Sequence, residues 1–254
     1  MNPITKLALM EWWKAKSWML ALALVIAGAI IGPLVVAGNI DPTIVPLARS
    51  QWIYAGLVLT CWFYIPIVVS GIGENQRLRN HRLFWRSQGV CNRSYFSSLF
   101  AAGLVPLLAV NVLALALLVA FGNPAQPVLA KVQAIVLTVG AFGAVIPLCL
   151  GLSQLVSGAA TFFTAVAVIG AGLFAPSALE FIRERQGSSE TVRLLCEIGL
   201  AMIPQLRIGD QAERLTFGWA AIDVWWFIAA MGYLALWWLI LGGVGFVLFT
   251  SRKV

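Results

Sequence analysis

Residues 132–155, VQAIVLTVGAFGAVIPLCLGLSQL, form a long stretch without a single Asp, Glu, Lys or Arg. A helix needs about 20 mostly apolar residues to cross the hydrocarbon core of a bilayer, so this stretch predicts a transmembrane helix. The whole chain has the same character, because 61% of its 254 residues are hydrophobic and 11% are charged. Soluble domains have about 45–50% apolar and about 25% charged residues. The composition therefore excludes a soluble globular domain and predicts a polytopic membrane protein.

Further apolar runs long enough to form transmembrane helices occur at residues 18–38, 52–72, 99–121, 159–175 and 219–250. We therefore expect an all-α membrane protein in which residues 1–254 form a single transmembrane domain with six spans. The run 159–175 is the shortest, so five spans plus one re-entrant helix is the alternative. Prolines remove a backbone hydrogen bond and kink helices. They lie within or at the edge of the first five runs, at Pro33, Pro66, Pro106, Pro147 and Pro176.

The basic residues predict the orientation of these spans, because cytoplasmic loops carry an excess of Lys and Arg. With both termini in the cytoplasm, the inner segments hold ten of the 17 basic residues and two acids, whereas the outer segments hold seven of each. The whole positive excess then lies on one side, which predicts cytoplasmic termini. The segment 73–96 falls on the same side. It must be an aqueous loop, because its five arginines would cost roughly 12–18 kcal/mol at the bilayer centre.

The predicted outer segment 177–218 is too long for an ordinary structureless connection. Ser177 followed by Glu180 matches a capping box and predicts that a helix starts after Pro176. Residues 189–203, SETVRLLCEIGLAMI, place charged and apolar side chains on opposite faces. They predict a short amphipathic helix that rests on the membrane or on the bundle, and an outer gate is its alternative role.

Two further features lie next to predicted spans. Residues 1–17 combine three lysines with Trp12 and Trp13 just before the first span, which predicts a helix in the membrane interface. Asp223 lies near the start of the last run, where the dipole at a helix N-terminus favours a carboxylate. We therefore interpret Asp223 as a helix-terminal residue, with a proton relay as the alternative.

The chain lacks the residue patterns of an enzyme or of a nucleotide-binding protein. No glycine precedes a lysine, so the phosphate-binding pattern G-x-x-x-x-G-K-[ST] is absent. One histidine, four scattered cysteines and no paired carboxylates within the spans predict no catalytic residue, no metal site and no cofactor bound by this chain. If ATP drives the protein, the ATPase is a separate subunit.

Several stretches resemble the permease subunits of type-2 ABC exporters. Residues 8–20, ALMEWWKAKSWML, are similar to the interfacial helix that leads into the first span of that family. Residues 73–103, GENQRLRNHRLFWRSQGVCNRSYFSSLFAAG, are similar to its first cytoplasmic loop, in which a basic helix and a short turn precede the third span. Residues 232–254, GYLALWWLILGGVGFVLFTSRKV, are similar to its last span and basic tail, and MIPQLRIGD at 202–210 is similar to the segment before that span.

The resemblance implies a second permease copy, as a homodimer or a related heterodimer, with the substrate path between the copies. It also implies separate ATPase subunits that bind ATP and Mg²⁺, and it makes the loop 73–96 a coupling element that docks on the ATPase. Arg and aromatic side chains are enriched at interface hot spots. The residues expected to dock are Glu74, Arg79, Arg82, Leu83, Phe84, Trp85 and Arg86. The alternative is that these arginines only contact lipid headgroups.

The expected location is the inner (cytoplasmic) membrane of a bacterium, with membrane lipid and protein subunits as partners and no nucleic acid. Two other classes of function stay open: an ion-coupled secondary transporter, and a non-transporting membrane assembly factor. A secondary transporter is disfavoured because few ionisable residues lie deep within the predicted spans. The apolar spans do not identify the transported substrate.

Overall fold

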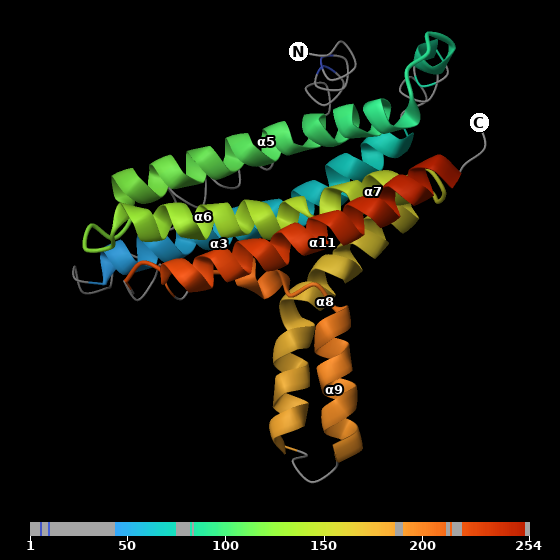
Figure 1. The fold of residues 1–254 in the computed structure, drawn as a ribbon. Coiled ribbons are helices and arrows are strands. Elements are labelled where there is room, and N and C mark those ends of the chain that lie inside the picture. Colours follow the sequence, from blue (N-terminus) through green and yellow to red (C-terminus); the bar gives the residue numbers. More distant parts are fainter. Residues whose placement is uncertain are drawn as a thin grey trace.

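The computed structural model describes residues 6, 10, 44–74, 82, 84–185, 190–211, 214 and 220–251. Every regular element in this part of the chain is helical (Figure 1). The elements are α3 (Val45–Glu74), α5 (Asn92–Phe121), α6 (Val128–Gly143), α7 (Val145–Leu152), α8 (Gly158–Arg185), α9 (Glu190–Met202), the 3-10 turn η1 (Leu206–Gly209) and α11 (Val224–Ser251). The all-α prediction is confirmed for the described residues.

The long helices run back and forth along one bundle (Figure 1). At one end, which we name the loop end, α3 ends, α5 and α8 begin, and α11 ends; the opposite end is the far end. Among the described residues, four helical segments are long and apolar enough to cross a membrane: α5, α6 with α7, residues 158–182 of α8, and α11. The predicted first span, 18–38, and the predicted helix 1–17, apart from residues 6 and 10, lie outside the described residues.

The five predicted runs that fall within the described residues coincide with helices, but one predicted boundary is wrong. The helix that the capping-box pattern predicts after Pro176 does not start there, because α8 continues through this proline to Arg185. The Ser177 hydroxyl instead accepts a hydrogen bond from Arg207 Nη1 at 2.7 Å. A proline inside a membrane helix is tolerated where neighbouring elements support the backbone. Here the segment before η1 packs so closely on α8 that a Cβ at Gly172 would lie 2.6 Å from the carbonyl oxygen of Pro204.

The fourth predicted span is broken into α6 and α7 at Ala144. Pro147 accounts for the break, because it has no N–H to donate to the carbonyl of Gly143 and its ring crowds that carbonyl. The helix is thus interrupted one turn before Pro147, where the loss of a backbone hydrogen bond is expected. The two pieces together are the most buried of the four candidate spans, so they form the centre of the bundle.

α7 crosses α11 at two glycines. A Cβ at Gly151 would collide with the backbone of Gly245, and a Cβ at Gly245 would collide with the carbonyl of Pro147. Small residues at such crossings let helix backbones approach closely, which strengthens packing inside a membrane. The position of α11 against α7 therefore depends on the absence of side chains at this crossing.

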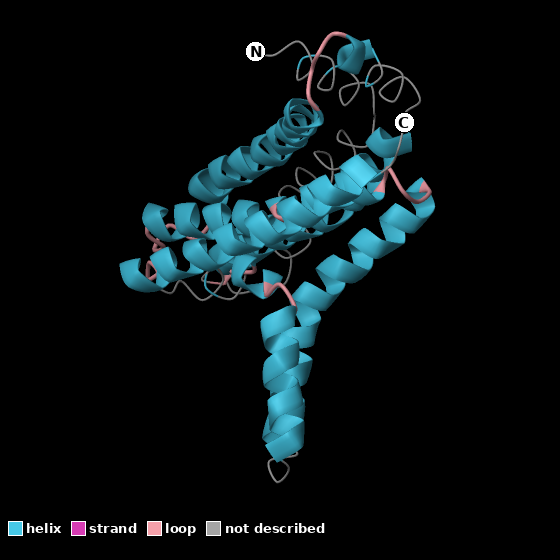
Figure 2. Ribbon diagram, turned by 45° about the vertical axis from the view of Figure 1, so that its right-hand side comes forward, coloured by secondary structure: helices cyan, strands magenta, loops and turns pink. Residues whose placement is uncertain are grey.

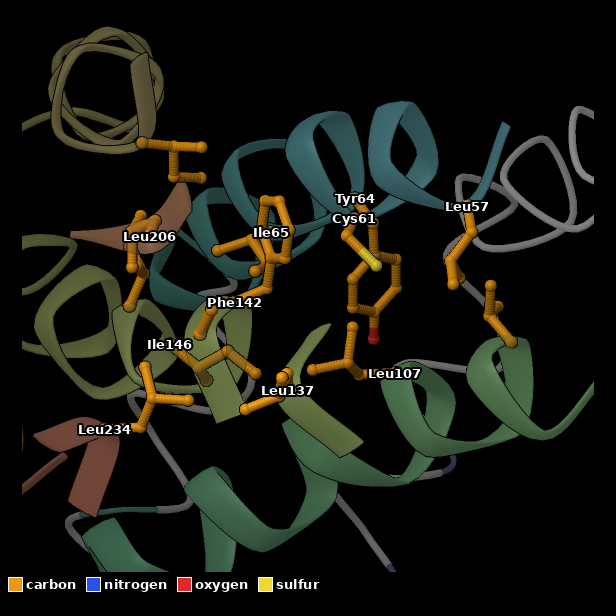
Figure 3. Close-up of a cluster of buried hydrophobic side chains, with 14 of the residues drawn as sticks. Leu57, Cys61, Tyr64, Ile65, Leu107, Leu137, Phe142, Ile146, Leu206 and Leu234 are labelled. Atoms are coloured by element: carbon orange, nitrogen blue, oxygen red, sulfur yellow. The ribbon is translucent and has the colours of Figure 1, made fainter. Parts of the chain in front are cut away.

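Side chains of α3, α5 and α6 meet in the core of the bundle (Figure 3). Leu57, Cys61 and Tyr64 of α3 are buried there together with Leu107 of α5 and Leu137 of α6. Dispersion contacts of this kind hold helices together where the surrounding lipid is as apolar as the side chains. The core thus fixes α3 against α5 and α6.

A buried polar cluster attaches η1 to this core. Tyr54 of α3 donates a hydrogen bond to the carbonyl of Gly209 in η1, and its oxygen lies 2.6 Å from Thr138 Oγ1 of α6. Gln211 N donates to the same tyrosine oxygen at 3.1 Å. Buried backbone groups outside regular helices need such partners. The cluster therefore lets the irregular segment after α9 return to the bundle.

The C-terminal part of α8 and the whole of α9 lie side by side and extend away from the bundle (Figure 2). Cys196 of α9 is buried, whereas Arg193 and Glu197 form an exposed ion pair at 3.0 Å. The apolar side chains exposed on another face of α9 are Leu194, Leu195, Ile198 and Met202. The predicted amphipathic helix is therefore present, but it packs against α8 and does not rest on the bundle.

Asp223 occupies the N-terminus of α11. Its Oδ2 accepts hydrogen bonds from the backbone N–H groups of Trp225 at 2.9 Å and Trp226 at 3.2 Å. These N–H groups have no partner within the helix, so the carboxylate acts as an N-cap. The interpretation of Asp223 as a helix-terminal residue is confirmed.

Candidate docking site at residues 73–96

The segment predicted to dock on a partner joins α3 to α5 at the loop end. Glu74 is the last residue of α3. Arg79 and Leu83 lie outside the described residues, as do the other positions between Glu74 and Phe84 except Arg82. The geometry of the site therefore comes from Arg82 and from residues 84–96.

Residues 84–87 are helical, and a Schellman motif ends this helix. Val90 N donates to the carbonyl of Trp85 at 3.0 Å, and Gly89 N donates to the carbonyl of Arg86 at 3.1 Å. Gly89 has φ of +78°, the left-handed conformation that this motif requires one residue past the C-cap. Trp85 and Val90, the two positions that make the hydrophobic contact of the motif, both pack against the core.

Substitution of Gly89 by alanine tests the role of this turn. Nothing lies within 4 Å of a Cβ at this position, so the cost is purely conformational, at about 1 kcal/mol for a non-glycine residue with positive φ. We expect Gly89→Ala to lower the thermal stability of the purified protein slightly and to speed hydrogen exchange in residues 84–90. Gly89→Asn is the control, because asparagine tolerates this conformation better, and an equal loss in both variants would contradict the explanation.

Phe84 and Trp85 are adjacent in sequence but face different surroundings. Phe84 is 54% exposed, whereas Trp85 is half-buried and packs against the hydrophobic core. Their rings meet edge to face with centroids 5.5 Å apart. Trp85 therefore attaches the helix to the bundle and holds Phe84 at the protein surface.

Arg82 is directed into the protein, with only 5% of its surface exposed. Its Nη2 lies 3.3 Å from the carbonyl oxygen of Phe249 and 3.5 Å from Asn92 Oδ1. The guanidinium carbon lies 4.3 Å from the centroid of the Phe249 ring, within the range of a cation–π interaction. The last four carbonyls of a helix lack intrahelical donors, and cations are favoured there. Arg82 thus supplies a donor to the last described turn of α11, whose described residues end at Ser251.

The structure therefore assigns the described residues two positions. Phe84 and Arg86 are exposed at the surface of the loop. Arg82 does not share that surface, although it was also expected to dock. Sequence reasoning missed Asn92 and Phe249 as partners of Arg82. The sequence pointed to this contact only indirectly, because its basic residues predict that the loop and the C-terminus lie on the same side of the membrane.

The described residues offer no metal-binding cluster of three or more His, Cys, Asp or Glu side chains. Cys61, Cys91, Cys149 and Cys196 are free thiols. The described part of the loop presents the exposed aromatic ring of Phe84 two residues from the exposed Arg86. No protein-family model, curated protein or solved structure matches this chain.

Proposed function

We propose that this chain is the membrane-spanning permease subunit of an ATP-driven ABC exporter. Two permease copies, identical or related, form the substrate path in the inner membrane, with their termini in the cytoplasm. Separate ATPase subunits bind ATP and Mg²⁺ and dock on the loop 73–96. This chain binds no nucleotide itself.

One observation carries the proposal: the loop presents Phe84 at its surface while Trp85 and Arg82 join the same loop to the bundle. An exposed aromatic side chain beside arginines has the composition of an interface hot spot. Lipid headgroups would attract the arginines alone. Because the loop is attached to the core and to the end of α11, a movement imposed on Phe84 reaches the helices directly. These two properties are what a coupling element needs.

Substitution of Phe84 by alanine tests the docking role. The permease is co-purified from native membranes, its ATPase subunit is identified by mass spectrometry, and the affinity of the two purified proteins is measured. We expect Phe84→Ala to weaken binding about tenfold to thirtyfold, equivalent to about 1.5–2 kcal/mol. Phe121→Ala is the matched control, because Phe121 is 56% exposed but ends α5 at the far end of the bundle. Unchanged affinity in Phe84→Ala would overturn the docking role.

A second measurement separates the classes of function. The reconstituted complex should hydrolyse ATP faster when its substrate is present, and the ion gradient should have no effect on transport. Transport that follows an ion gradient without ATP would identify a secondary transporter. An ATPase partner without any substrate-stimulated hydrolysis would identify an assembly factor.

A further inference from the structure

The 3-10 turn η1 lies about halfway along the bundle. A Cβ at Gly209 would lie 2.6 Å from the Cβ of Ala141 and 3.4 Å from the Cα of Thr138, both in α6. Helices rise by about 1.5 Å per residue, so Thr138 lies about 15 Å from the start of α6 at Val128 and about 21 Å from the end of α7 at Leu152. A hydrocarbon core of about 30 Å that is centred on α6 and α7 therefore has η1 close to its middle.

Two charged residues are exposed at that depth. Arg207 lies within η1, and Asp210 follows the turn directly. Nη1 of Arg207 donates a hydrogen bond to Ser177 Oγ of α8, which is also exposed. No described acid forms an ion pair with Arg207. A charge in the middle of a bilayer is costly, and long side chains reach the membrane surface only from near helix ends. Arg207 and Asp210 therefore need a polar environment beside them.

The C-terminal part of α8 and the whole of α9 carry further charges away from the same place. α8 lies against the segment before η1, because a Cβ at Gly172 would lie 2.6 Å from the carbonyl oxygen of Pro204. Beyond this contact the two helices extend away from the bundle (Figures 1 and 2). Their exposed charged residues are Glu180, Glu184, Glu190, Arg193 and Glu197. Hydrocarbon disfavours such residues, so this side of the bundle does not suit contact with lipid tails.

The opposite side of the bundle has the exposed residues that lipid requires. α5 lies on that side in both views (Figures 1 and 2). Val112 of α5 is 64% exposed, and Leu108 one turn before it is exposed as well. Val112 lies nine residues, or about 13–14 Å, from the end of α5 at Phe121. At the same depth, therefore, the bundle presents apolar side chains on α5 and charged side chains at η1.

We propose that the face formed by α8, η1 and α9 borders a water-filled path inside the membrane, and that polar or charged groups of the cargo pass along it beside Ser177, Arg207 and Asp210. Irregular backbone at membrane depth is tolerated where it is buried in protein or lines a water-filled cavity, and ionisable residues at this depth mark substrate pathways. This inference rests on the proposed function, because it gives the position of the exporter's substrate path. It also implies a cargo with hydrophilic groups.

Cysteine labelling of the protein alone, in phosphatidylcholine proteoliposomes, tests for water at this face. The reagent is a methanethiosulfonate with a trimethylammonium group, added on both sides of the membrane. Ser177→Cys should react about a hundredfold faster than Val112→Cys, because excluding one charge from the bilayer interior by about 2.7 kcal/mol corresponds to this factor. Asp210→Cys should react as Ser177→Cys does. Mass spectrometry of the labelled peptides distinguishes these positions from the native exposed thiol of Cys91.

Equal rates at residues 177 and 112 would overturn the inference, whether both are fast or both are slow. If Ser177→Cys does not fold, the comparison of Asp210→Cys with Val112→Cys decides the question.

A transport measurement then tests the path itself. In the reconstituted complex, unlabelled Ser177→Cys should transport like the wild-type protein, and the label at residue 177 should block ATP-driven transport. Transport that continues with the label in place would show that water reaches this face but that the cargo does not pass there, which would overturn the path. Failure of the exporter proposal is distinguishable, because it would appear as a wild-type complex without ATP-driven transport and would leave the contrast in labelling unchanged.

Discussion

Gly245→Ala is expected to destabilise the bundle by about 3 kcal/mol, the upper end of the cost of overpacking a well-packed interior. The added Cβ would lie 2.9 Å from the backbone N of Leu148 and closer still to the carbonyl of Pro147. Neither atom belongs to a flexible side chain, so α7 and α11 must separate to accommodate it. We expect the purified variant to unfold at a clearly lower temperature than the wild-type protein. On heating, it should also cease to elute as a monodisperse peak at a lower temperature.

Two neighbouring glycines of the same helix supply the control. A Cβ at Gly242 or Gly243 meets nothing within 4 Å. Alanine is favoured over glycine inside a helix by about 1 kcal/mol. Gly242→Ala and Gly243→Ala should therefore leave thermal stability unchanged or raise it slightly. If all three variants behaved alike, the close crossing of α7 and α11 would not contribute to stability.

Arg82→Met is expected to lower the free energy of local unfolding of the loop by about 2 kcal/mol, because the carbonyl of Phe249 and the Asn92 side chain lose a charged donor. Methionine keeps a long apolar side chain in the buried position. A decrease of this size in local stability makes backbone amides exchange about thirtyfold faster, because exchange occurs through local opening. The measurement is hydrogen exchange of residues 84–90, followed by mass spectrometry.

Arg86→Met is the matched control for this variant, because Arg86 lies in the same helical segment and is exposed. It should leave exchange in residues 84–90 within error of the wild-type protein. Arg82→Lys should fall between the two, since lysine keeps the charge but loses the planar guanidinium that stacks on Phe249. Equal exchange in Arg82→Met and the wild-type protein would show that Arg82 does not hold the loop.

The positions of the long helices could be predicted from the sequence because apolar runs of span length have few other stable structures. The runs 52–72, 99–121 and 219–250 coincide with most of α3, α5 and α11. Their ends could not be predicted as well. Helices continue past the apolar region wherever polar side chains find partners, and α5 accordingly begins at Asn92, inside the predicted loop.

The docking site was predicted only in outline. Counting charges assigns residues to a side of the membrane, but it does not distinguish an arginine in water from one packed on an aromatic ring. Arg82 and Arg86 therefore looked equivalent, whereas one is buried against Phe249 and the other is exposed.

The contact between Arg82 and Phe249 also orders events during biosynthesis, because its two residues are 167 positions apart. Ribosomes add about 5–20 residues per second, so Arg82 is made roughly 8–33 seconds before Phe249. During this interval the guanidinium has no helix terminus to bind. The loop between α3 and α5 therefore reaches its final structure only after α11 has been synthesised, and a chain released before its last helix would leave the ribosome with this loop unfinished.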